Sequence, residues 1–404
     1  MDDIENMVQN IKEKIGQQYF QADFKGNFYW WRISAKADKK FLRQIFKATQ
    51  VTQPELDIIS VLPGHIKDDI LSCLPLRDAI RTSVLSKKWK NQWRTIRELV
   101  FDTDNVFSEL PQNPVMVEMK IYNIIYHVLL NHSGPIDLFS FLDSTGDMNV
   151  RSHGTEFDSW LLYLSKRNVQ SLVLDFSKEE TYSIPWCLFT FQHLRHLDLS
   201  CCSLKPPPTF GGMCNLKTLK LTKVNISQVD LENVIRICPE LEYLTLVGIE
   251  GFSRININAP SLKSFAILGP AVEFNLQYKF QLTHLSMLFS TEINRYPPSS
   301  NLTTVFGGLP LLKKLFLSRK VLKYFTAGAG VVPVNLPTPL NNLGYLYLSI
   351  KFSNKMELSA SLCLLRSSPN LQRFEITVRC LIFTLLLGYS IVSSNVSPPL
   401  NNYM

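Results

Sequence analysis

The second half of the chain carries a repeating apolar pattern, L-x-x-L-x-L, in which polar or aromatic residues separate the leucine positions. The first copy is Val169-Leu172-Leu174 and the last is Leu371-Phe374-Ile376. Nine copies can be counted, and their starts lie 20 to 31 residues apart. The alternation within each copy is typical of a short strand, because successive strand side chains point to opposite faces. The pattern therefore predicts nine short strands between residues 161 and 378.

This spacing indicates a leucine-rich repeat, whose units are about 20–29 residues long. The second copy fits the longer pattern L-x-x-L-x-L-x-x-C-x-L at Leu194, Leu197, Leu199, Cys202 and Leu204, which makes Cys202 a turn residue of the repeat. No unit can bury its leucines without neighbouring units. We therefore expect an α/β (α+β) fold in which a small helical domain precedes a solenoid with a curved parallel sheet.

The residues between the leucines must face away from the core, onto the inner surface of the curved sheet. They mix aromatic side chains with charges of both signs, which suits a protein epitope better than a nucleic-acid backbone. A nucleic-acid site would call for a basic stripe. The predicted binding surface consists of His196, Asp198, Lys220, Tyr243, His284, Lys314, Phe316, Tyr345, Tyr347 and Arg373.

The segment 57–101 has a helical pattern instead. A first predicted helix begins after Pro63 and ends at Pro75, because the residue before a proline rarely stays helical. Asp78 can begin a second helix, and Ser86 can cap a third helix with tryptophans on one side. The apolar residues of these helices exceed what so short a segment can bury by itself. Some of them must face a partner protein. A longer helix is predicted at 115–130.

Composition narrows the class of protein without naming a partner. The chain has 404 residues, of which 46% are hydrophobic and 19% charged, so disorder throughout is excluded. The formal net charge of +8 is spread along the chain and identifies no partner. No two of the eight cysteines form a C-x-x-C pair, and the acidic N-terminus lacks the apolar run of a secretory signal. We expect an intracellular protein, in the nucleus and/or cytoplasm, with reduced cysteines.

Three other features suggest different chemistry but have simpler explanations. His193 and His196 have no third metal ligand nearby, and zinc needs three or four. The basic run 87–94 contains tryptophans that could stack on bases, but a solvated helix face explains its charges. The apolar stretch 380–392 is shorter than the about 20 residues of a membrane span. No nucleophile, phosphate-loop or acid–base motif is present. We expect no catalytic residue, metal or cofactor, and no nucleic-acid or membrane partner.

Residues 57 to 378 resemble the plant F-box/leucine-rich-repeat proteins of the FBD type. The likeness rests on LPGHIKDDILSCLPLRDAIRTSVLSKKWKNQW, on VLLNHSGPI and WLLYLSKRNVQSLVL, and on LCLLRSSPNLQRFEI near the end. In that family the F-box binds the Skp-type adaptor of a cullin-RING ubiquitin ligase, and the repeats hold the substrate. The resemblance implies ten adaptor contacts, which are Leu62, Pro63, Ile66, Ile70, Leu74, Pro75, Val84, Leu85, Trp89 and Trp93.

The domain order expected from this resemblance is an irregular extension at 1–56, the F-box at 57–101, a linker with a helical lead-in at 102–160, the repeats at 161–378 and a tail at 379–404. The tail departs from the family, because CLIFTLLLGYSIVSSNVSPPLNNYM stands where the FBD module should continue, as in a truncated or alternatively spliced product. The implied function is that of a non-catalytic substrate-recognition subunit of an SCF-type (Skp-cullin-F-box) ubiquitin ligase. The alternatives are a leucine-rich-repeat ligand-binding or inhibitor protein not engaged with a ubiquitin ligase, and a ligase subunit that senses a small molecule.

Overall fold

The structure is a computed structural model that describes residues 63–103, 114–144, 154–176, 182–208, 210–252, 254–276, 281–290, 305–306, 308–322, 325 and 332–377. All of these residues belong to one compact unit, Ala35–Val378. The predicted extension at 1–56, the predicted tail at 379–404 and Leu62 lie outside the described residues.

The described part of the chain begins with two short helices, α4 (Gly64–Ser72) and α5 (Leu76–Arg81). Each has a proline at its N-cap position, Pro63 and Pro75, where the missing N–H removes no helical hydrogen bond. The helix α5 therefore begins at Leu76, before the predicted start at Asp78. It continues into the 3₁₀ turn η1 (Thr82–Val84), and a second 3₁₀ turn, η2 (Gln92–Thr95), follows.

The prediction of a third helix from Ser86 is wrong. The amide of Trp89 bonds the carbonyl of Ser86 at 3.0 Å, and the amide of Gln92 bonds the carbonyl of Trp89 at 3.1 Å. Both bonds span three residues, so the chain makes tight turns instead of an α-helix. As a result Trp89 enters the core, whereas Trp93 stays half-buried at its edge. The local helical pattern does not form a helix here, and the turns place Trp89 in the core instead.

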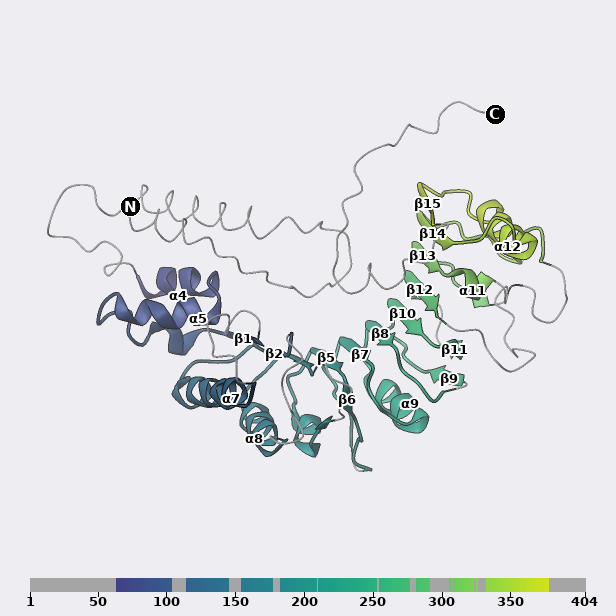
Figure 1. Ribbon diagram of the computed structural model, residues 1–404. Helices are drawn as coiled ribbons and strands as arrows, with labels where there is room; N and C mark the ends of the chain where they lie inside the picture. Colours follow the sequence, from purple (N-terminus) through teal and green to yellow (C-terminus); the bar gives the residue numbers. More distant parts are fainter. Residues whose placement is uncertain are drawn as a thin grey trace, which may run out of the picture. The chain divides into compact units, whose positions relative to one another are not determined.

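An eleven-stranded parallel sheet forms the main part of the fold, with its strands in chain order along an arc (Figure 1). The register places leucines opposite leucines on neighbouring strands, as with Leu197 and Leu219. The sheet therefore confirms the predicted α/β solenoid. Its strands are β1 (Glu98–Asp102), β2 (Leu138–Leu142), β3 (Ser171–Asp175), β5 (His196–Ser200), β7 (Thr218–Thr222), β8 (Tyr243–Val247), β10 (Ser264–Gly269), β12 (His284–Phe289), β13 (Lys314–Leu317), β14 (Tyr345–Ser349) and β15 (Arg373–Thr377).

The predicted number of nine strands is too low, because β1 and β2 also belong to the sheet. Both strands keep the spacing of the repeat but use phenylalanine in place of leucine, as Ile96-Leu99-Phe101 and Ile136-Phe139-Phe141. All six of these side chains are buried. The solenoid therefore begins at the end of the predicted F-box, and the range predicted as a linker contributes a strand and helices to it.

Helices cover the outer side of the arc (Figure 1). The first, α7 (Pro114–Asn131), confirms the helix predicted at 115–130. Rings from strands and helices form the core beneath it, where the centroid of Phe157 lies 5.0 Å from that of Phe141 and 5.2 Å from that of Phe176. The remaining outer elements are α8 (Gly154–Ser165), η3 (Trp186–Thr190), α9 (Gln228–Arg236), α11 (Arg319–Leu322), α12 (Lys355–Arg366) and two small sheets, β4 (Tyr182–Ser183) with β6 (Cys202–Ser203) and β9 (Arg254–Ile257) with β11 (Glu273–Leu276).

A sharp turn ends the strand in four successive repeats, at Cys201, Lys223, Gly248 and Gly269, and all four residues have a positive φ. The first three donate their amides to carbonyls of the next strand at 2.7 to 2.9 Å. At Gly269, with φ of +125°, a Cβ would lie 2.9 Å from the Cα of Gly248, so glycine alone fits without a backbone shift. Cys202 follows the first of these turns and is fully buried.

Candidate functional site

Two of the predicted adaptor contacts are strongly exposed. Val84, the last residue of η1, is 87% exposed, and Leu85 beside it is 42% exposed. Val84 gains almost no burial within the chain and Leu85 keeps a substantial exposed part, so a partner that covers them would remove apolar surface from water. These two residues are therefore the most accessible large aliphatic side chains among the predicted adaptor contacts that the structure describes.

The other predicted adaptor contacts are less accessible. Pro63 is exposed, and Ile66 and Pro75 are half-buried. The remaining contacts that are partly accessible also pack against the core, and they are Ile70, Leu74 and Trp93. These side chains can meet a partner only with the part of their surface that the core leaves open.

Trp89 corrects the prediction. Its indole is only 2% exposed, and the Nζ atom of Lys67 lies 5.7 Å from the ring centroid, a cation–π arrangement. A side chain so enclosed has almost no surface to offer to an adaptor. Its role is to hold α4 and the turns after α5 together.

The helical segment is joined to the first repeats by several polar contacts. The Arg94 guanidinium donates from Nε to the carbonyl of Asn131 at 2.7 Å and from Nη2 to its side-chain oxygen at 2.9 Å. Two amides after α7, those of Ser133 and Gly134, donate to the Arg94 carbonyl at 2.9 and 3.1 Å. A Cβ on Gly134 would lie 2.9 Å from the Cα of Thr95. The F-box segment and the first repeats are thus closely packed.

On the inner side of the sheet, the parallel register aligns the predicted binding residues in two rows, one at the first and one at the third position of the strands. The first row holds His196, Tyr243, His284, Lys314, Tyr345 and Arg373. The third-position row holds Asp198, Lys220, Phe316 and Tyr347. All ten lie on the face that the alternation predicted.

Two of the ten are nevertheless buried, His196 at 8% and Asp198 at 4% exposed, on a strand with every residue buried. The Asp198 carboxylate pairs with the Lys220 ammonium at 2.8 Å. Burial, with Lys220 nearby, lowers the pKa of His196 to about 4. Burial also raises the pKa of Asp198, although Lys220 opposes this. The prediction that His196 and Asp198 present their side chains to a partner is therefore wrong.

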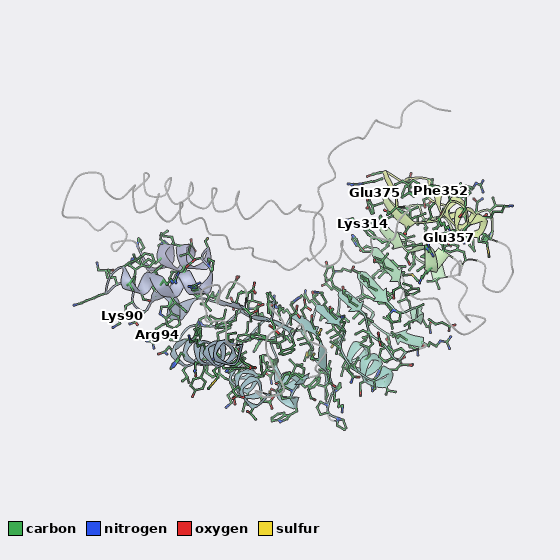
Figure 2. All side chains as sticks on the ribbon, viewed as in Figure 1. Lys90, Arg94, Lys314, Phe352, Glu357 and Glu375 are labelled. Carbon is green, nitrogen blue, oxygen red and sulfur yellow. The ribbon has the colours of Figure 1, made fainter. Side chains whose placement is uncertain are left out.

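The remaining eight predicted residues keep part of their side chains accessible, and five of them lie on β13–β15. Figure 2 shows Lys314 on the side of these strands away from α12. Burial and the charges of Lys314 and Lys313 lower the pKa of His284 on the neighbouring strand. Burial and the adjacent Glu375 raise the pKa of Tyr345. The inner face is thus closed at β5 and keeps partly accessible side chains from β7 onward.

Sequence reasoning missed several inner-face residues, among them Ser286 and Glu98. Ser286 pairs with Phe316 in the third-position row, and Glu98 on β1 begins the first-position row. The same alternation would have found Ser286. The strand that carries Glu98 was missed because its repeat uses phenylalanine.

Within the described ranges, no three His, Cys, Asp or Glu side chains come together in a way that could hold a metal ion. In the same part of the chain, no helix combines the length and the apolar character needed to cross a bilayer. The stretch at 380–392 lies outside the described residues.

Comparison with known proteins identifies the family. Residues 59–101 match the model of the F-box domain, and residues 157–376 match that of the leucine-rich repeats of "FBD-associated F-box protein At5g56370". The chain belongs to the plant F-box/FBD/LRR-repeat family. The first match spans α4 to β1, and the second spans most of α8 through to β15.

Several relatives from Arabidopsis thaliana agree with this assignment. F-box/FBD/LRR-repeat protein At1g13570 is 35% identical, covering 80% of this chain and 76% of that protein. Putative F-box/LRR-repeat protein At3g58880 is 27% identical, covering 80% of this chain and 77% of that protein. F-box/FBD/LRR-repeat protein At3g52680 is 31% identical over a shorter stretch, 52% of this chain and 45% of that protein.

Proposed function

We propose that this protein is the substrate-recognition subunit of an SCF-type ubiquitin ligase. The F-box match at residues 59–101 supports this most directly, since an F-box in general binds a Skp-type adaptor. The exposed Val84 and Leu85 supply aliphatic surface that such a partner can bury, and removal of apolar surface from water favours association.

The repeats would hold the substrate, and the described F-box residues and repeats form one compact unit. Contacts such as that between Arg94 and Asn131 fix the junction of the F-box with the first repeats. A substrate bound to the sheet would therefore be held at a defined distance from the adaptor. The chain would raise the rate of ubiquitin transfer by proximity alone, because tethering raises the local concentration of substrate lysines.

Binding of a recombinant plant Skp-type adaptor to the full chain tests the proposal. We expect the wild type to bind and the double variant Val84→Asp, Leu85→Asp to bind at least roughly tenfold more weakly, because a partner would have to bury unpaired carboxylates. The matched control is Val229→Asp, which changes another exposed valine in the repeats and should bind as the wild type does. Substitution of Trp89 is unsuitable here, since its loss would disturb the core.

Two results would contradict the proposal in different ways. Equal binding by the double variant would show that the site assignment is wrong. A wild-type chain that binds no Skp-type adaptor would instead favour a leucine-rich-repeat ligand-binding or inhibitor protein outside any ubiquitin ligase.

A further inference from the structure

The last three strands gather aromatic side chains on the inner face of the sheet. Phe316 on β13 lies with its ring centroid 5.1 Å from that of Tyr345 and 6.0 Å from that of Tyr347, both on β14. We call these three residues the aromatic cluster. All three are half-buried, so part of each ring faces solvent. Aromatic groups of this kind are enriched at the centres of protein interfaces.

One edge of the aromatic cluster is held in place by a network from β15. The Glu375 carboxylate accepts a bond from the Tyr345 hydroxyl at 2.8 Å and one from Nε of Arg373 at 2.6 Å. The Arg373 guanidinium carbon also lies 5.5 Å from the Tyr345 ring centroid. Side chains fixed before binding lose little conformational freedom when a partner arrives.

Once the Glu375 carboxylate is paired with Arg373, the remaining charge beside the aromatic cluster is the positive charge of Lys314. Glu375 is the one carboxylate that the described residues of β13–β15 bring to this face, and Tyr345 and Arg373 already occupy both of its oxygens. Lys314 lies next to Tyr345 in the register. No described residue forms an ion pair with its ammonium, and none hydrogen-bonds the Tyr347 hydroxyl. Figure 2 shows Lys314 and Glu375 on the same side of the sheet. An incoming carboxylate would find, beside an aromatic surface, a cation with no ion-pair partner among the described residues.

The repeat of β5 differs from this arrangement. On β5 the side chain of Asp198 is buried and its charge is already paired with Lys220. The cations near the aromatic cluster, Lys314, Lys313 and the Glu375-paired Arg373, are few for a phosphate backbone, whose binding needs several neutralised phosphates. The observations therefore favour a protein segment over a nucleic acid.

We infer that the substrate docks on β13–β15 through a short segment in which an acidic residue stands next to an aromatic or large aliphatic one. The apolar side chain would pack against the aromatic cluster while the carboxylate pairs with Lys314 and accepts from the Tyr347 hydroxyl. Charge-assisted bonds of this type fix orientation, and the apolar contact supplies most of the affinity. This inference rests on the proposed function, in which the sheet binds a substrate.

Selection from a phage-displayed library of random 12-residue peptides on the full chain tests the inference. We expect enrichment of peptides with Asp or Glu beside Phe, Tyr, Trp or Leu. The enriched peptides should bind Lys314→Glu and Tyr347→Ser at least tenfold more weakly in fluorescence anisotropy. Two matched controls, Lys205→Glu and Tyr126→Ser, change exposed residues away from the aromatic cluster and should bind as the wild type does.

Several outcomes would overturn the inference. These are the absence of any enriched peptide, enrichment of basic or uncharged peptides, unchanged binding by Lys314→Glu, and tighter binding of a 12-nucleotide RNA than of any peptide. Binding of the Skp-type adaptor by the same preparation separates the two proposals. A chain that binds the adaptor but no acidic peptide overturns the docking site alone, whereas one that binds such peptides but no adaptor overturns the ligase assignment.

Discussion

Replacement of Trp89 by alanine tests whether this residue holds the F-box together. The Trp89 ring is almost fully enclosed, so it adds almost no surface to the predicted adaptor site. We therefore expect Trp89→Ala to act through stability, whereas Val84→Ala, at a strongly exposed site, should leave stability nearly unchanged. The two variants form a matched pair, because both truncate an apolar side chain of the same small segment.

The size of the effect follows from the burial of the indole. An enclosed tryptophan removes about 150–250 Å² from water, which at about 25 cal/mol per Å² corresponds to about 4–6 kcal/mol. Tryptophan-to-alanine substitutions in cores typically cost about 3–5 kcal/mol. A loss of about 3 kcal/mol changes an opening equilibrium by roughly a factor of 100, since about 1.4 kcal/mol corresponds to a factor of ten.

Hydrogen exchange followed by mass spectrometry measures this effect in the full chain. Peptides covering α4 and α5 should lose roughly 100-fold or more of their protection in Trp89→Ala, and peptides from the repeats β7 to β12 should change little. Protection within about threefold of the wild type in α4 and α5 would refute the assignment of Trp89 to the core. Equal losses in Val84→Ala would refute the assignment of that residue to the surface.

Three further predictions concern the repeats. Burial lowers the pKa of His196 from its ordinary value of 6.5 to about 4, so the unfolded chain binds the proton first as the pH falls. The protein should therefore lose up to about 3 kcal/mol of unfolding free energy through His196 between pH 7 and pH 4. His196→Gln should remove that part of the loss in urea titrations at pH 7 and pH 4.5, and identical pH dependence in both proteins would contradict it. The buried Glu357 carboxylate accepts a hydrogen bond from the Asn354 side chain at 2.9 Å at the start of α12. Glu357→Ala should therefore lower the unfolding free energy by about 1–3 kcal/mol, and a urea midpoint equal to that of the wild type would disprove this. Gly269→Ala should destabilise by more than about 1 kcal/mol because of its positive φ and its contact with Gly248, and thermal unfolding unchanged from that of Gly251→Ala, an open site of positive φ, would show that the close contact does not matter.

Most of the sheet could be predicted from the sequence because leucine spacing reports strand pairing directly. A residue such as Leu199 must be buried wherever the repeat stacks, and no distant part of the chain changes that. The spacing failed at β1 and β2, because Phe101 and Phe141 fill the leucine positions and helices interrupt the period. A search for any large apolar residue, instead of leucine, would have found both strands.

Accessibility was harder to predict than orientation. The alternation placed Asp198 and Tyr347 correctly on the inner face, but burial depends on neighbours from other repeats, so Asp198 is enclosed while Tyr347 keeps accessible surface. The same limit applies to the F-box, where Trp89 and Val84 looked equivalent as apolar residues. Their roles are separated by tertiary packing, which the local pattern does not contain.

Titration calorimetry of the purified chain with a purified plant Skp-type adaptor measures most directly whether the F-box surface is a docking site. We expect saturable binding of one adaptor per chain, retained in Val229→Asp and weakened roughly tenfold or more when Val84 and Leu85 both become aspartate. The assignment to a ubiquitin ligase would be contradicted by a wild-type chain that gives no heat of binding with any Skp-type adaptor, although hydrogen exchange shows that it is folded.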